Sequence, residues 1–252
     1  MRSSTASILL LSAAASGARA SDWDGSYKFG NMFYSGPTKN GVTITRATYS
    51  LVPPAVPCGY ATSGGNEELA LWIGIQDDPT GQDVMNEDFV QPLLNWAPNQ
   101  QLTGCDTDNT KWCVAASTYT PSGQIGQTYQ PITANMQLDF ELVVGSSVKQ
   151  TISSGGKVIS TQTNAEGMKP AVFYGANECY LQSCGTLEGY TWENITVHLS
   201  AADTAYGSTL TLTGATSDGF KTTDGGKTWT NSAITINKDY LYTDNKEHEC
   251  SS

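Results

Sequence analysis

Histidine, basic residues and helical periodicity are all scarce in this sequence. Its 252 residues include two histidines and 13 lysines and arginines, against 24 aspartates and glutamates, so the formal net charge at pH 7 is −11. This shortage of basic residues argues against nucleic acid as a partner, because nucleic-acid binding relies on Lys and Arg contacts to phosphate. His198 lies in a strand-like run and His248 near the end of the chain. Neither position suits the histidine of a Ser-His-Asp triad.

The short motifs of several enzyme classes are missing as well. There is no G-x-S-x-G elbow, no H-E-x-x-H, no zinc-type Cys/His spacing and no phosphate or dinucleotide fingerprint. The acidic residues Asp77, Asp78 and Asp83 are interpreted as a solvated turn rather than a calcium site. We therefore expect no metal and no cofactor. Any chemistry must use amides, carboxylates, tyrosines and tryptophans.

The stretch MRSSTASILLLSAAASGARA, residues 1–20, has the pattern of a secretory signal peptide. Arg2 precedes a short apolar run, and a small-x-small site ends at Ala20. That run is too short to span a bilayer, and no later run is long enough. We expect a secreted protein, or one held in a secretory or vacuolar compartment, with no membrane span. Asn194 begins a glycosylation sequon inside a strand-like segment.

Six cysteines form an even set, which in a secreted chain indicates up to three disulfides. Cys105 and Cys113 are close in sequence, as are Cys179 and Cys184. Pairing each of these locally leaves Cys58 for Cys250, which is one of fifteen possible arrangements.

Short alternating or β-branched runs recur along the chain, with Gly, Pro, Asn and Asp between them. This pattern is typical of an antiparallel β-sandwich or jelly roll, and we expect one all-β domain over residues 21–240 with a loose tail over 241–252. Ser154-Gly155-Gly156 predicts a hairpin. The segment TTDGGKTW (222–229) matches an Asp-box, but a single copy indicates a capped hairpin rather than a propeller. The expected strands cover residues 41–51, 69–75, 88–96, 111–119, 136–145, 147–153, 156–162, 170–175, 190–200, 208–214 and 230–236.

The run FVQPLLNW, residues 89–96, looks like a buried strand with a glutamine inside it. A buried amide is costly unless it is hydrogen-bonded, so Gln91 is either a satisfied structural amide or part of a site. Such a site would also need apolar walls and phenol groups, which tryptophans and tyrosines can supply. The candidates could equally be core residues or ordinary strand residues. These are Trp72, Trp96, Trp112, Tyr180 and Tyr190.

The segments LWIGI (71–75) and FVQPLL (89–94) resemble the glutamic peptidases called eqolisins, which carry Trp-x-Gly-Ile and then a glutamine in a Leu-Gln context. Residues 44–57 resemble that family's strand ending in Val-Pro, and residues 136–161 its long twisted hairpin. The resemblance covers most of the chain through short motifs. It implies a bent, glutamic-peptidase-like or concanavalin-like β-sandwich and places Gln91 at the family's catalytic glutamine.

The glutamate partner in that family stands in an Ala-Glu-aromatic motif, for which two registers are possible here. One places Val172 at the position, which would abolish proteolysis. The other places Glu178 there, with Cys179 where an aromatic residue is expected. In the second register the resemblance implies an acid endopeptidase active at low pH, in which the carboxyl group activates water and Gln91 stabilises the oxyanion.

The segments LVPPAVP, KWCVAAS and ECYLQSCGTLEGYTWENITV resemble a second set of secreted fungal proteins, the hetero-Diels–Alderases of tropolone–sesquiterpenoid biosynthesis. That resemblance implies a cofactor-free enzyme of secondary metabolism that joins a quinone methide to a terpene alkene by holding two small apolar substrates face to face. Gln91, Tyr180 and Tyr190 would polarise the diene carbonyl. The apolar walls would be Trp72, Trp96 and Trp112.

Three functions therefore remain open, and the cycloaddition is our first expectation. The alternative is an acid glutamic-type endopeptidase that uses Gln91 and Glu178. A further alternative is a carbohydrate-binding module or polysaccharide lyase, in which exposed tryptophans and tyrosines stack on sugars.

Overall fold

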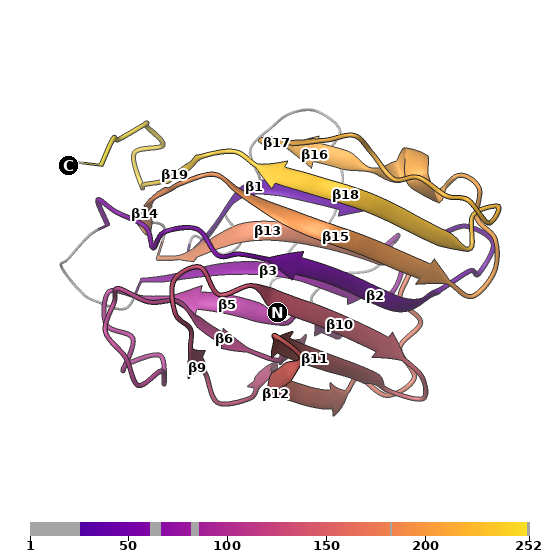
Figure 1. Ribbon diagram of the computed structural model, residues 1–252, viewed down its shortest axis with the longest axis horizontal. Coiled ribbons are helices and arrows are strands. Elements are labelled where there is room, and N and C mark those ends of the chain that lie inside the picture. The colour runs from indigo at the N-terminus through magenta and orange to yellow at the C-terminus, as the bar shows by residue number, and fades with distance from the viewer. Residues whose placement is uncertain (1–25, 61–66, 82–85, 182, 251–252) are drawn as a thin grey trace, which may run out of the picture.

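The computed structural model describes residues 26–60, 67–81, 86–181 and 183–250, and in these ranges the chain is almost entirely antiparallel β-structure (Figure 1). The predicted all-β sandwich is confirmed. The expected signal peptide lies outside the described residues, as does Asp83. No helix in the described ranges has the length and hydropathy needed to cross a membrane.

The larger sheet contains ten of the described strands and carries the residues discussed below as a site. Its main path runs in the order β16 (Thr211–Thr213), β1 (Tyr27–Ser35), β13 (Val172–Tyr180), β3 (Glu68–Gln76), β4 (Phe89–Val90), β7 (Ser117–Thr120) and β8 (Gly123–Gly126). The strand β5 (Leu93–Trp96) also pairs with β3, and continues through β6 (Cys113–Ala115) to β9 (Gln130–Pro131).

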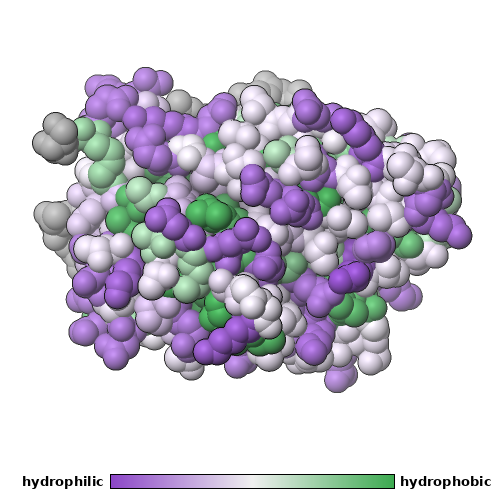
Figure 2. Space-filling view, in the orientation of Figure 1, coloured by the Kyte–Doolittle hydropathy of each residue, from purple (hydrophilic) through white to green (hydrophobic). Residues whose placement is uncertain are grey.

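The second sheet packs against the first and contains seven described strands. Their order is β12 (Lys157–Asn164), β11 (Val148–Ser154), β10 (Leu138–Val144), β2 (Ile44–Leu51), β15 (Tyr190–Leu199), β18 (Thr228–Ile236) and β17 (Ala215–Ser217). Figure 2 shows the outer face of this sheet as largely polar with separate small apolar areas. One core-facing and one solvated side is the usual state of an antiparallel sheet.

The main core lies between the two sheets and is rich in aromatic residues. Tyr49 on β2 stacks on Phe140 with ring centroids 4.9 Å apart and meets Trp192 edge-on at 5.5 Å. The Tyr49 hydroxyl donates a 2.9 Å hydrogen bond to the Ile73 carbonyl on β3, in the opposite sheet. This buried bond ties the two sheets together at a fixed register.

The strand β3 is buried on both of its faces. Successive side chains alternate between faces, so Leu71 and Ile73 point into the main core while Ala70 and Trp72 point to the other side. A second apolar cluster forms on that other side, and its buried members are Met32, Trp72, Phe89, Leu93 and Ala176.

Three disulfides join the six cysteines in the predicted pairing, which is confirmed. The Cα atoms are 6.5 Å apart in Cys105–Cys113, 5.9 Å in Cys179–Cys184 and 5.7 Å in Cys58–Cys250. Three disulfides fit an oxidising, extracellular or secretory location.

The expectation of a loose tail over 241–252 is wrong for its described part. Leu241 is fully buried in β19 (Asp239–Leu241), which pairs with β14 (Gly185–Leu187). The Lys28 ammonium group donates to the Tyr242 carbonyl at 2.5 Å, and Lys238 forms a 2.6 Å ion pair with Glu249. These contacts and the Cys250 disulfide dock the tail on the domain.

Other strand predictions need correction. The expected strand 88–96 is two strands, β4 and β5, because Pro92 has no N–H for the ladder. The expected strand 170–175 extends to Tyr180, and β1 was not anticipated. A turn with positive φ at Gly155 and Gly156 joins β11 and β12, which confirms the hairpin.

The single Asp-box match is a capped hairpin, as expected. The Asp224 carboxylate accepts hydrogen bonds from the backbone N–H groups of Lys227 and Thr228, at 3.1 and 2.9 Å. These bonds hold the pKa of that carboxyl below its usual range. Trp229 is 6% exposed and packs in the main core.

The strand β4 lies so close to Gly74 that there is no room for a side chain at this position. Replacing Gly74 should therefore destabilise the fold. A Cβ at Gly74 would lie 2.3 Å from the Phe89 ring and 2.7 Å from the Val90 carbonyl oxygen. We expect Gly74→Ala to lower the free energy of unfolding by about 1–3 kcal/mol through overpacking. Gly145→Ala is the control, since its Cβ would meet only the Ser147 carbonyl oxygen at 3.8 Å. Equal denaturant midpoints for the two variants would contradict this.

Candidate functional site

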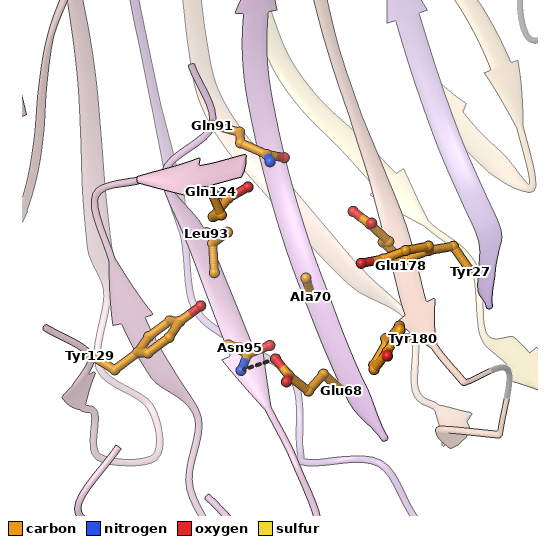
Figure 3. Close-up of a pocket in the computed structure, with 10 residues that line it drawn as sticks. All are labelled: Tyr27, Glu68, Ala70, Gln91, Leu93, Asn95, Gln124, Tyr129, Glu178 and Tyr180. Atoms are coloured by element: carbon orange, nitrogen blue, oxygen red, sulfur yellow. Dashed lines mark hydrogen bonds between the residues drawn. The ribbon is translucent and has the colours of Figure 1, made fainter. Parts of the chain in front are cut away.

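A pocket of about 240 Å³ opens on the face of the ten-stranded sheet that points away from the main core. Its walls come from β1, β3, β5, β8 and β13 and from the segments around Gln91 and Tyr129 (Figure 3). The lining residues are Tyr27, Glu68, Ala70, Gln91, Leu93, Asn95, Gln124, Tyr129, Glu178 and Tyr180.

Gln91 lies in the break between β4 and β5. Both strands pair with β3 in one register, with Val90 opposite Ile75 and Leu93 opposite Trp72. The backbone N–H of Gln91 donates to the Ser117 carbonyl at 3.0 Å, which fixes the segment from its other side. The side chain is 7% exposed, and its Oε1 has no hydrogen-bond partner. A buried amide oxygen without a partner costs about 1–3 kcal/mol, which favours a role for Gln91 in a site over a purely structural one.

Glu178 lies on β13, next to β3, and is held by a tryptophan. In the pairing of the two strands Glu178 lies opposite Ala70, and Ala176 lies opposite Trp72. The indole N–H of Trp72 donates a 2.7 Å hydrogen bond to Glu178 Oε2. Burial raises the pKa of the Glu178 carboxyl to about 7, helped by the nearby charge of Glu68 and opposed by the Trp72 hydrogen bond.

Gln91 and Glu178 project into the same pocket from opposite sides of β3. Figure 3 shows Gln91 on one side of β3 and Glu178 on the other, with Ala70 on β3 below them in the view. A buried carboxyl group with a pKa of about 7 and an amide side chain thus border the same space. Such a pair can move a proton and stabilise a developing oxyanion.

A second carboxyl group, Glu68, occupies the lower part of the pocket. Asn95 Nδ2 donates to Glu68 Oε2 at 3.2 Å (Figure 3). Burial raises the pKa of Glu68, and the Asn95 hydrogen bond opposes that shift. Burial also raises the pKa of the Tyr129 phenol, and the charges of Glu68 and Glu178 add to this. The pocket therefore combines two interacting carboxyl groups with phenols.

The predicted site residues divide between this pocket and the core. Tyr180 lines the pocket, with its ring centroid 5.1 Å from that of Tyr27, and Trp72 supports Glu178 from the second apolar cluster. Trp96 is fully buried in the main core and donates to the Asn109 carbonyl, so its assignment to a substrate-binding wall is wrong.

Two further assignments to this pocket are wrong for similar reasons. Tyr190 is buried in the core, and its hydroxyl donates to Asn177 Oδ1 at 2.7 Å. Trp112 donates to the Pro54 carbonyl and borders a separate pocket beside residues 53–56.

The two registers proposed for the glutamate partner lead to different places. Val172 is fully buried at the far end of β13, opposite Gln76, whereas Glu178 lines the pocket with Gln91. Glu178 lies within β13, two residues before its end at Tyr180. Its alternation along β13 directs it to the pocket.

The remaining predicted positions lie elsewhere. Asn194 is exposed at an irregularity of β15, where its φ is 55°, and its glycosylation stays a prediction. His198 lies near Thr228, and His248 pairs with Asp244. Asp77 accepts the backbone N–H of Lys169 at 2.6 Å. Within the described ranges no group of three or more His, Cys, Asp or Glu side chains could hold a metal ion.

Sequence reasoning missed several residues of the pocket. Glu68 and Ala70 could have been found, because they precede Trp72 by four and two positions and so share its face of β3. Asn95 could have been found from Gln91 and Leu93 in the same way. No local signal pointed to the others, which are Tyr27, Gln124 and Tyr129.

Comparisons with known proteins give only distant likenesses. No protein-family model and no curated protein matches the sequence. Among solved structures, scytalido-glutamic peptidase with a transition-state analog inhibitor is 12% identical over 81% of this chain and 97% of that chain, with a TM-score of 0.49. SCP-B, an eqolisin-family peptidase bound to the tripeptide Ala-Ile-His, is 10% identical over 82% and 97%, with a TM-score of 0.44. A Bacillus licheniformis β-glucanase is 10% identical over 81% and 69%, with a TM-score of 0.33. Likenesses this weak do not identify a function.

The raised pKa of Glu178 predicts a pH-dependent cost to stability. With a folded value of about 7 against 4.5 in the unfolded chain, its stabilising contribution is complete below pH 4.5 and is lost as the pH rises through 7. We expect Glu178→Gln, which stays neutral, to gain about 2–3 kcal/mol in free energy of unfolding relative to wild type between pH 4.5 and 8. Denaturant unfolding at several pH values measures this.

The matched control for that comparison is Glu193→Gln, on the exposed face of β15. Its stability should run parallel to that of wild type across the same pH range. If the Glu178→Gln curve were parallel too, the account of a buried, neutral Glu178 would be wrong.

Proposed function

We propose that this protein is a hydrolase of the glutamic-peptidase type, in which Glu178 is the acid–base catalyst and Gln91 stabilises the oxyanion. The observation that carries the proposal is that these two side chains enter one pocket from opposite sides of β3, with the carboxyl group poised near neutral pH. A peptide bond is the substrate that best uses this pair, because its hydrolysis needs both a proton carrier and an oxyanion donor.

The steps follow from the two groups. The ionised Glu178 carboxylate takes a proton from water as the water oxygen attacks the carbonyl carbon. The amide N–H of Gln91 then donates to the oxygen that becomes negatively charged. Glu178 returns the proton to the leaving nitrogen as the C–N bond breaks, so no proton is gained or lost over the cycle. The Trp72 hydrogen bond holds the carboxyl group in place throughout.

The pKa of Glu178 sets the pH range in which this chemistry works. Water activation needs the ionised form, which for a pKa of about 7 is depleted as the pH falls below neutrality. A peptidase built on this pair is therefore expected to gain activity as the pH rises to about 7. This differs from the low-pH optimum implied by resemblance to the eqolisins.

Digestion of an unfolded protein substrate between pH 3 and pH 9 tests the proposal. We expect kcat/KM to rise with an apparent pKa of about 7 and then level off. Glu178→Gln should lower kcat/KM by about 10²–10⁴-fold, and Gln91→Ala by about 10²–10³-fold. Glu193→Gln should leave it unchanged. A kcat/KM for Glu178→Gln equal to that of wild type would contradict the proposal.

A cofactor-free cycloaddition is the second candidate, and one observation favours it. Below pH 7 the neutral Glu178 carboxyl group can donate a hydrogen bond to a carbonyl oxygen, beside the apolar cluster that contains Trp72, Phe89 and Leu93. Such a donor would polarise an oxadiene carbonyl, while the apolar floor would hold an alkene partner.

The two candidates predict opposite responses at Glu178. Cycloaddition of an apolar oxadiene with an alkene should be fastest below pH 7, where the donor is protonated. Glu178→Gln should keep most of that rate, because its amide can still donate, whereas Glu178→Ala should lose it. Product formation followed by chromatography at pH 5 and pH 9 distinguishes them. A rate that increases with pH, or that is lost in Glu178→Gln, would rule out this role for the carboxyl group.

The carbohydrate-binding alternative has little support. Sugar-binding grooves present exposed aromatic rings, but each tryptophan in the described ranges is less than 10% exposed.

A further inference from the structure

The pocket that holds Gln91 and Glu178 has an unbalanced charge. Among the ten lining residues that the structure describes, Glu68 and Glu178 are acidic and none is Lys, Arg or His. The charge of Glu68 already opposes ionisation of Glu178. A bound molecule that carried positive charge into this space would relieve that repulsion, and a negatively charged one would increase it.

Acidic and amide side chains place several hydrogen-bond acceptors in the pocket. Glu178 Oε2 receives the indole N–H of Trp72, and Glu68 Oε2 receives the amide of Asn95. Gln91 is 7% exposed, its side chain is directed over β3 into the pocket, and its Oε1 is buried without a hydrogen-bond partner. A ligand with several N–H donors would satisfy these oxygens together.

Aromatic rings stand on both sides of Glu68. Figure 3 shows Tyr129 on one side of the Glu68–Asn95 pair and Tyr180 on the other. Tyr27 lies against Tyr180, with the two ring centroids 5.1 Å apart. The faces of phenol rings attract cations, and partial burial strengthens that attraction. Carboxylates and rings together form the environment in which proteins bind organic ammonium groups.

We propose that this pocket binds a primary ammonium group, as on a lysine side chain of a peptide substrate, with Glu68 as its counter-ion and Tyr129 and Tyr180 beside it. This rests on the proposed function only in the choice of a peptide as the carrier of the ammonium group. Glu68 acts in recognition, which leaves Glu178 and Gln91 for the chemistry. The bound cation favours the ionised form of Glu178, which water activation requires.

Binding of a small probe tests the inference without any turnover. n-Butylammonium and its uncharged isostere 1-butanol would be titrated into the protein at pH 7.5, and backbone amide NMR shifts would follow the binding. We expect the ammonium to bind at least about fivefold more tightly, with the largest shifts in β3 and β13. Equal affinity for the two probes, or shifts confined to other parts of the molecule, would overturn the proposal.

Variants at Glu68 locate the effect. Glu68→Gln should weaken n-butylammonium binding by about fivefold to tenfold and leave 1-butanol binding unchanged, whereas Glu68→Asp, which keeps the charge, should retain the preference for the cation. The exposed control Glu193→Gln should behave as wild type. If Glu68→Gln binds n-butylammonium as tightly as wild type does, Glu68 is not the counter-ion and the proposal fails.

Peptide cleavage separates this inference from the proposed function. Matched peptides with lysine or norleucine at one position would be compared, and we expect the lysine peptide to have a KM about fivefold to tenfold lower in wild type but not in Glu68→Gln. Equal KM values with cleavage that depends on Glu178 would refute cation recognition and leave hydrolysis standing. Tight n-butylammonium binding with no cleavage of any peptide would refute hydrolysis and leave the cation pocket standing.

Discussion

The strand β3 must bury both of its faces, and the rest of the structure depends on this constraint. One face of β3, which carries Leu71 and Ile73, packs in the core between the two sheets. There the Tyr49 hydroxyl of the opposite sheet donates a hydrogen bond to the Ile73 carbonyl. The other side of β3 would be an exposed sheet face in many sandwiches. Here it carries Trp72 and a second apolar cluster, and the pocket opens beside that cluster. The site is thus a direct result of the alternation of one strand.

The same burial that completes this face gives the pocket its chemistry. A carboxyl group beside apolar and aromatic side chains loses hydration, which disfavours its ionised form. The pKa of Glu178 is therefore raised to about 7. The neighbouring Glu68 adds to the effect, and the Trp72 hydrogen bond limits it. Gln91 leaves an acceptor unpaired where the strand breaks at Pro92. Both features lower stability in the free protein, as is common at functional sites.

Much of the fold could be predicted from the sequence, because most strands have a local signal in the alternation of their residues and in the turn residues beside them. Alternation and turn residues located most strands, Gly155-Gly156 predicted a hairpin, and cysteine spacing gave the disulfide pairing. The errors arose where long-range pairing decides the outcome. β1 contains polar and glycine residues and is a strand because it lies between β13 and β16. β13 continues through Glu178 because β3 pairs with it along its whole length.

The pocket was harder to predict than the fold. Gln91 stood out as a polar residue in an apolar run, and Glu178 through resemblance to a family, but their meeting in one pocket required the order of strands in the sheet. The tryptophans gave wrong site predictions, because an indole ring is equally suited to a protein core and to the wall of a binding pocket. Trp96 is core, and only burial distinguishes the two.

Both the stability and the proposed chemistry of the pocket depend on Glu178 being a buried carboxyl group with a pKa of about 7 that shares the pocket with Gln91. An NMR titration of glutamate side-chain carboxyl carbons, with the Glu178 signal assigned by its loss in Glu178→Gln, measures this directly. The account predicts a midpoint of about pH 7 that moves down in Glu68→Gln, since the charge of Glu68 contributes to the shift. A midpoint near 4.5, unchanged in Glu68→Gln, would mean that Glu178 is an ordinary solvated carboxylate and would contradict the account.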